Sequence, residues 1–168
     1  KELTAIQEQL KQLHLFEGKY TAPAHMHLTL KFLGEIDAPL LQKTADILRT
    51  VKFVPFALCI TKIGVFSEKC IRIIWAQAAG KEIYDLQKSI DAALAVFPKE
   101  GRFMGHITIA RVKQVKNREK LLQTLQNITS HQESCLVDKF VLRKSVLTPI
   151  GPKYTDIAVF PCHEKEKI

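Results

Sequence analysis

The sequence predicts an α+β fold of two similar lobes, each a small, mainly antiparallel sheet with helices on one face, with a cleft between the lobes. Three observations lead to this prediction. A short motif in a strand-like segment at residues 27–30 returns at residues 106–109, and helical and then strand-like patterns follow each copy. The composition, 46% hydrophobic and 25% charged, is typical of a globular protein with a substantial core. We expect residues 1–168 to form one two-lobed domain.

Hydrophobic periodicity assigns the elements in chain order. The first half is expected to contain a helix over 1–15, a strand over 25–33, a helix opening at Asp37 and Pro39, and strands over 53–63 and 71–76 with Gly64 as a turn or bulge. The second half is expected to contain a helix over 81–97, a strand over 103–112, a helix over 118–128, and strands over 136–147 and 154–160 joined by a hairpin connection at 148–152.

The two copies of the repeat differ at their beginnings. A strand and a helix precede the second copy, whereas only the helix over 1–15 precedes the first. We therefore expect that a strand is missing before Lys1, either because the sequence starts inside the natural protein or because the first strand was removed.

Charge and cysteine spacing narrow the class of protein. Lys and Arg outnumber Asp and Glu, 25 to 17, which favours polyanionic partners such as nucleic acid or phosphorylated metabolites. There is no apolar run of the ~18 residues that a membrane span needs and no signal-peptide pattern. We expect a cytoplasmic monomer without a membrane partner. The four cysteines show no C-x-x-C spacing, so neither disulfides nor a zinc site are expected; they are Cys59, Cys70, Cys135 and Cys162.

Two copies of a His-x-Thr-x motif are the candidate site. The first motif is His27-Leu28-Thr29-Leu30 and the second motif is His106-Ile107-Thr108-Ile109. Because side chains alternate along a strand, the histidine and threonine of each motif lie on one face, about 7 Å apart. An approximate two-fold relation between the lobes would bring the two faces together, with one imidazole on each side of the cleft.

Two opposed imidazoles suit in-line displacement at phosphorus. The attacking and departing oxygens lie on opposite sides of the phosphorus, so a general base and a general acid are needed on opposite sides too. Imidazole, with an unperturbed pKa near ~6.5, can serve in either role without a metal. The threonine hydroxyls can donate hydrogen bonds to the non-bridging oxygens as charge builds.

Two cations are candidates for phosphate or RNA contact. Simple alternation puts Arg111 on the face opposite His106 and Thr108, so it reaches the site only if the strand twists, bulges or ends there. Lys31 has the right parity with His27, although a surface lysine would show the same pattern.

Other functions remain open from the residues alone. His25, His27 and His106 could hold a metal, but no carboxylate cluster accompanies them, and we expect no metal. A basic, non-catalytic RNA-binding module fits the charge but gives the paired histidines no role. The same phosphodiester chemistry on a small cyclic nucleotide fits as well, and the size of the pocket would decide.

The sequence resembles the two-histidine (2H) phosphoesterase superfamily, specifically its RNA 2′,3′-cyclic phosphodiesterase branch, historically called 2′-5′ RNA ligase. The resemblance covers nearly the whole chain and rests on residues 27–35, 64–66, 73–76, 106–111 and 145–154. It implies that His27 is the general acid, that His106 is the general base, and that Thr29, Thr108 and Arg111 contact the phosphate.

The reaction implied by this resemblance opens a 2′,3′-cyclic phosphate at an RNA end to give a 2′-phosphomonoester, without metal or other cofactor. The same site could join RNA through a 2′-5′ linkage; no nucleotide-activating lysine motif is present, so ATP-driven ligation is not expected. Further candidates for RNA contact are Arg72, Lys113, Lys116, Arg143 and Lys153 for phosphates and Phe66, Trp75 and Tyr154 for bases.

Overall fold

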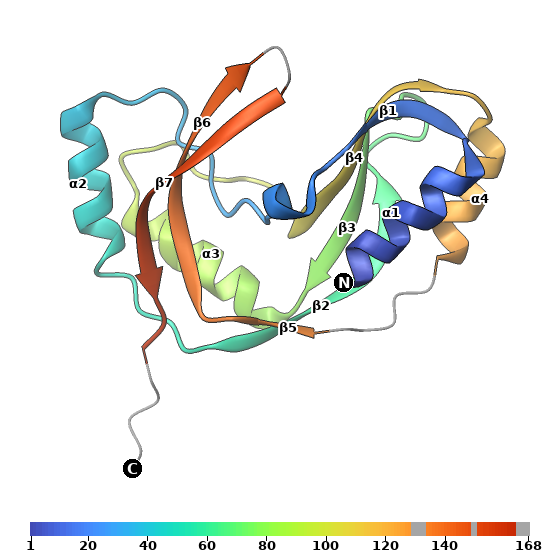
Figure 1. Cartoon of the computed structure of the whole chain (residues 1–168). Helices are drawn as coiled ribbons and strands as arrows, with labels where there is room; N and C mark the ends of the chain where they lie inside the picture. Colours follow the sequence, from blue (N-terminus) through green and yellow to red (C-terminus); the bar gives the residue numbers. More distant parts are fainter. Residues whose placement is uncertain (129–133, 149–150, 164–168) are drawn as a thin grey trace. The chain divides into compact units, whose positions relative to one another are not determined.

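The computed structural model describes residues 1–128, 134–148 and 151–163, and its α+β architecture confirms the predicted fold class. The elements are α1 Glu2–Leu13, β1 Phe16–Tyr20, the 3₁₀ turn Pro23–His25, α2 Ala38–Leu48, β2 Phe56–Val65, β3 Ile73–Ala79, α3 Lys81–Ala93, β4 His106–Val115, α4 Arg118–Asn127, β5 Ser134–Val137, β6 Lys139–Thr148 and β7 Gly151–Pro161. One antiparallel sheet has the order β1-β4-β3-β2-β5, and β6 pairs with β7 in a second (Figure 1).

The chain forms two compact units, each assembled from three separate stretches. The first unit contains residues 1–29, 59–80 and 104–134, and the second contains residues 30–58, 81–103 and 135–168. Neither unit is one copy of the internal repeat, because each takes segments from both copies. Both motif histidines belong to the first unit.

The core of the first unit lies on one face of the sheet. Alternate residues of β3 are 0% exposed, namely Ile74, Ala76 and Ala78. The amphipathic α1 buries Ile6 and Leu10, and its Gln7 side chain donates to the carbonyls of Thr21 and Ile109 at 2.8 and 2.9 Å. Two backbone acceptors are thereby satisfied where α1 meets the sheet. The helix ends at His14, which adopts the left-handed conformation with φ 50°.

The second unit is built from α2, α3 and the β6-β7 hairpin. Asp37 caps α2 by accepting a hydrogen bond from the Leu40 N–H at 2.9 Å, as its position before Pro39 predicts. Phe140 of β6 stacks on Phe160 of β7 with 4.8 Å between ring centroids. Both rings are buried, so this aromatic pair forms part of the core of the second unit.

The structure corrects two of the predicted features and adds one strand. The segment 25–33 is not a regular strand: after the 3₁₀ turn only Leu28 pairs, through an isolated bridge to Ile107. β1, which the periodicity missed, already occupies the same edge of β4 along residues 110–115. Gly64 lies inside β2, and the bulge falls between Ile60 and Lys62 instead.

The strand expected over 136–147 is divided at Asp138 into β5 and β6. The Asp138 carbonyl accepts a hydrogen bond from the Cys162 N–H at 2.7 Å. Part of the expected hairpin connection, residues 149–150, lies outside the described residues.

Candidate active site

A single β-bridge brings the two motifs together. Leu28 of the first motif pairs antiparallel with Ile107 of the second. Directly opposed residues in an antiparallel pair share a face, and their neighbours in sequence take the other face. The histidine and threonine of both motifs therefore share one face of this pair, with His27 across from Thr108 and Thr29 across from His106.

The bridge makes His27 and His106 diagonal neighbours across the two segments. The Cα atoms of such positions lie about 7–8 Å apart. Both side chains are half-buried.

Each histidine makes the same hydrogen bond to its own backbone. His27 Nδ1 lies 2.7 Å from the carbonyl oxygen of His25, and His106 Nδ1 lies 2.8 Å from that of Met104. A carbonyl oxygen can only accept, so Nδ1 carries the proton in both rings and Nε2 is the basic nitrogen. The two motifs thus share the orientation of the imidazole and its tautomer as well as the residue pattern.

A bulge in β4 changes the position of Arg111. β3 pairs with β4 as Ile73 with Arg111, Trp75 with Thr108 and Gln77 with His106. The three β3 residues alternate on one face, so Arg111 shares that face with His106 and Thr108. Ile109 is the extra residue that restores the parity. The Arg111 side chain is exposed and has no ion pair or hydrogen bond within the described part of the chain, and its contact with phosphate stays a prediction.

Lys31 belongs to the second unit and has its partner within that unit. Its Nζ forms an ion pair with Asp91 and donates to the Pro98 carbonyl at 2.6 Å. The Lys31 and Asp91 side chains are only 3% and 7% exposed. The hydrogen bond from Lys31, with a further one from the Glu100 N–H, lowers the pKa of Asp91 below its ordinary value against the opposing effect of burial. The buried ion pair gives Lys31 a structural role, and we assign Lys31 no part in the proposed site.

Two features of this face escaped the sequence analysis. Lys19 of β1 lies across from Arg111, and both side chains are exposed. Phe66, named above only for base contact, packs its ring against His106.

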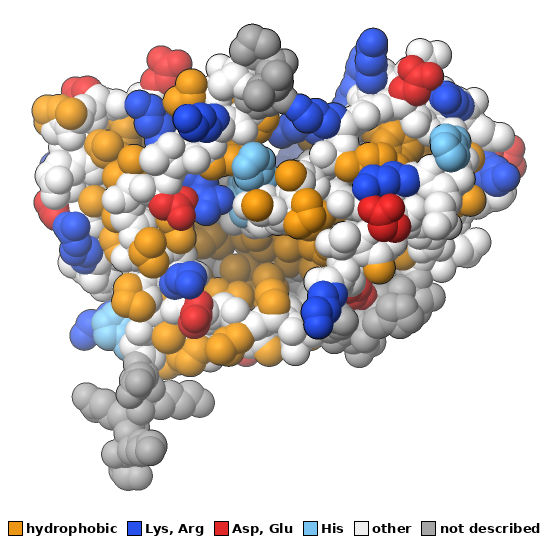
Figure 2. Space-filling model, viewed as in Figure 1, with side chains coloured by type: hydrophobic (Ala, Val, Ile, Leu, Met, Phe, Trp, Pro, Cys, Tyr) orange, Lys and Arg blue, Asp and Glu red, His pale blue; other side chains and the backbone are white. Residues whose placement is uncertain are grey.

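Two other cations expected to contact RNA have acidic partners: Lys116 pairs with Glu17 at 3.4 Å and Arg143 with Asp156 at 2.6 Å. In the view of Figure 2, Lys and Arg side chains are scattered among acidic and uncharged ones.

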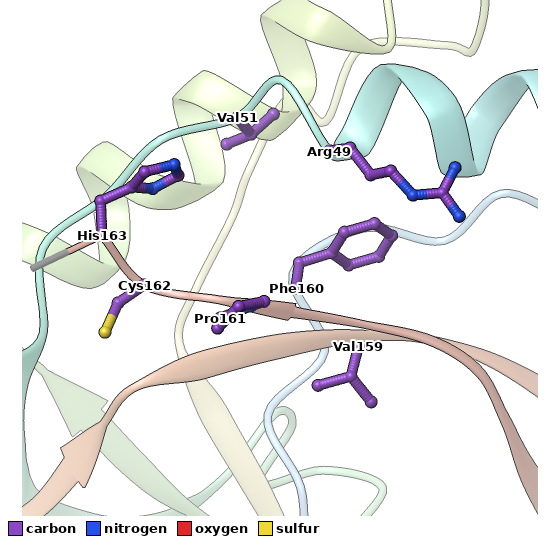
Figure 3. A pocket seen from close by; sticks show the side chains of 7 residues that line it. All are labelled: Arg49, Val51, Val159, Phe160, Pro161, Cys162 and His163. Carbon is purple, nitrogen blue, oxygen red and sulfur yellow. The ribbon is translucent and has the colours of Figure 1, made fainter.

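The motif residues do not line the cavity shown in Figure 3. That cavity, of about 450 Å³, belongs to the second unit and is lined by Arg49, Val51, Val159, Phe160, Pro161, Cys162 and His163. In the described ranges, no three His, Cys, Asp or Glu side chains gather as a metal site would require. Of the helices in those ranges, none has the length and apolarity to cross a membrane.

Comparison with known proteins identifies the family. The model of the family described as LigT like Phosphoesterase matches residues 1–75 and again residues 74–154. An RNA 2′,3′-cyclic phosphodiesterase of Methanothermobacter thermautotrophicus is 33% identical over 94% of this chain and 89% of that protein. One of Methanocaldococcus jannaschii is 32% identical over 91% of this chain and 88% of that protein.

Solved structures show the same fold. TT0787 of Thermus thermophilus matches with a TM-score of 0.74 and 24% identity, covering 98% of this chain and 91% of that one. LigT of E. coli in its apo form matches with a TM-score of 0.74 and 20% identity, covering 96% and 91%. The family match spans nearly the whole chain and confirms the resemblance seen in the motifs. The chain therefore belongs to the LigT-like phosphoesterase family and is an enzyme, a hydrolase of phosphodiester bonds.

Proposed function

We propose that the protein is an RNA 2′,3′-cyclic phosphodiesterase, which opens the cyclic phosphate at an RNA end to a 2′-phosphomonoester. The observation that supports this best is the bridge of Leu28 with Ile107, which sets two histidines and two threonines on one face. The relative from M. thermautotrophicus, 33% identical, is named for this activity.

In the proposed mechanism each histidine moves one proton. His106 takes a proton from water through Nε2, and the water oxygen forms a bond to phosphorus. The bond from phosphorus to the 3′ oxygen breaks, and His27, which starts the reaction as an imidazolium with protons on both Nδ1 and Nε2, delivers its Nε2 proton to that oxygen. Proton exchange with solvent restores both rings. The near-symmetry of the two motifs accommodates either assignment, and the resemblance to the family selects His27 as the acid.

The negative charge that builds on the phosphate needs compensation. The hydroxyls of Thr29 and Thr108 donate to the non-bridging oxygens, and Arg111 supplies a positive charge. This arrangement makes the proposed reaction independent of metal. If the 5′ hydroxyl of a second RNA replaces water, the same steps form a 2′-5′ linkage.

The cations beside the motifs favour an RNA strand over a small cyclic nucleotide. Arg111 of β4 pairs with Lys19 of β1, close along β4 to Thr108. Lys113, two residues further along β4, is also exposed. A strand with several phosphates gains from such charges, whereas a mononucleotide offers one phosphate only. Hydrolysis of 2′,3′-cyclic AMP as efficient as that of RNA would favour the small substrate.

One assay tests the proposal. RNA ending in a 2′,3′-cyclic phosphate is incubated with chelator and with the wild type, His27→Ala, His106→Ala or the control His163→Ala, whose side chain is exposed in the second unit. We expect a 2′-phosphate product and a loss of about 10²- to 10⁴-fold in kcat for each motif variant, but not for the control. Full activity of either motif variant would exclude paired acid-base catalysis. Loss of wild-type activity with chelator would point to a metal instead.

A further inference from the structure

Phe66 packs its ring against the second catalytic candidate. Its ring centroid lies 5.0 Å from that of His106, and the two ring planes are perpendicular at 90°. Phe66 also contacts Trp75, with 5.8 Å between centroids. Phe66 keeps 55% of its surface exposed, whereas Trp75 is only 6% exposed. Burial alone does not explain a phenylalanine in this place.

The backbone around Phe66 is arranged to allow this contact. Gly64 of β2 lies across from Trp75 of β3, and a Cβ at position 64 would come within 2.7 Å of the indole ring. The missing side chain lets the indole lie over β2. Phe66, which follows the last residue of β2, then packs against both the indole and His106.

His106 is consequently held on two sides. Its Nδ1 is tied to the Met104 carbonyl, and the Phe66 ring limits rotation of the imidazole about the Cβ–Cγ bond. The backbone before it is fixed as well, because the Gly105 carbonyl accepts from the Ala78 N–H at 2.9 Å. A Cβ at position 105 would lie 2.8 Å from the Ala78 oxygen, which explains the glycine there.

We propose that Phe66 is a positioning residue that aims Nε2 of His106 at the attacking water. This inference rests on the proposed function, in which His106 is the general base. A proton is transferred efficiently only over a short, aligned hydrogen bond, and a ring free to rotate spends less time in that alignment. The contribution of Phe66 therefore belongs to kcat rather than to substrate binding.

The test compares Phe66→Leu with Phe66→Tyr, and both with a matched control. Tyr84 and Phe103 form a similar ring pair in the second unit, at 5.2 Å and 79°, so Tyr84→Leu removes an equivalent contact that involves neither motif histidine. We expect Phe66→Leu to lower kcat on cyclic-phosphate RNA by about 10- to 100-fold with KM changed less than about threefold. Phe66→Tyr keeps the ring and should keep most of the activity, and Tyr84→Leu should leave kcat unchanged.

An NMR measurement adds a readout that needs no activity. Loss of the ring current in Phe66→Leu should shift the His106 imidazole resonances, and those of His163 should stay in place. A kcat of Phe66→Leu within twofold of wild type, an equal loss in Phe66→Tyr, or an effect on KM alone would overturn the positioning role. If the wild type fails to open the cyclic phosphate, the proposed function is wrong, and the NMR shift still decides whether the contact holds the ring.

Discussion

The two motifs have the same residue pattern but different supports. The second motif lies in β4 and pairs with β3 through His106, Ile107 and Thr108, and its bulged Ile109 is 0% exposed. The first motif follows a 3₁₀ turn and pairs only through Leu28. The β-bridge between Leu28 and Ile107 is therefore enough to bring the two motifs together. The two motifs do not need the same secondary structure.

The first motif is fastened at the ends of its segment. Before it, the Thr21 N–H donates to the Ile109 carbonyl at 2.9 Å. After it, Lys31 forms its buried ion pair with Asp91. A histidine can thus be fixed either by a row of strand pairs, as in β4, or by attachments at the two ends of its segment.

After the histidine variants, the threonine variants are expected to cause the largest loss of activity. Thr29→Val and Thr108→Val keep the shape of the side chain and remove the hydroxyl donor. Each should lower kcat by about 10²-fold, because one preorganised donor to a charged transition state is lost. Single-turnover kinetics on cyclic-phosphate RNA measures it. Similar losses in both variants would show that the two motifs are used symmetrically; no loss in either would contradict phosphate contact by the hydroxyls.

The tie after the first motif is expected to have a large effect on stability. Lys31→Met leaves the Asp91 carboxylate buried without its cation, which should lower the free energy of unfolding by about 3 kcal/mol. Urea unfolding measures this change. The double variant Lys31→Met/Asp91→Leu removes both charges and should recover most of the loss. If the single variant is as stable as the wild type, the pair does not hold this segment.

The same pair predicts a dependence of stability on pH. The folded-state pKa of Asp91 is lowered, so its contribution is fully present above the unfolded carboxyl pKa of about 3.9 and is lost as the pH falls through the folded-state pKa. Wild-type protein should therefore lose more stability than Lys31→Met/Asp91→Leu on acidification below about pH 4. Parallel acid-unfolding curves for the two proteins would contradict this.

The smallest expected effect concerns local opening and needs no substitution. His106, Ile107 and Thr108 of the second motif pair with successive residues of β3, whereas the first motif has a single bridge. Native-state hydrogen exchange should therefore be faster at Thr29 than at Thr108. Equal protection at the two positions would show that the end attachments fix the first motif as firmly as the sheet fixes the second.

The sequence predicted those parts of the fold that depend on local pattern. The helix stripe of Leu3, Ile6 and Leu10 and the cap at Asp37 lead directly to α1 and α2. The repeated His-x-Thr-x motif identified the family without a structure. β1 escaped because its five residues, Phe-Glu-Gly-Lys-Tyr, include a glycine and two charges.

Other features depend on partners far along the chain. The alternation around His27 suits a strand, but how much of it pairs depends on the space that β1 leaves along β4. The bulge at Ile109 follows from the register with β3 and leaves no mark in the local sequence. Lys31 looked like a surface or phosphate-binding residue because its partner, Asp91, lies 60 residues away.

In the proposed mechanism, His27 and His106 act as acid and base on one phosphorus atom. This assignment is tested most directly with a cyclic-phosphate RNA whose leaving 3′ oxygen is replaced by sulfur, since a thiolate departs without a proton from a general acid. We predict that His27→Ala regains most of the wild-type rate on this substrate and that His106→Ala remains impaired. Equal impairment of both variants on the sulfur and oxygen substrates would contradict the acid-base pair.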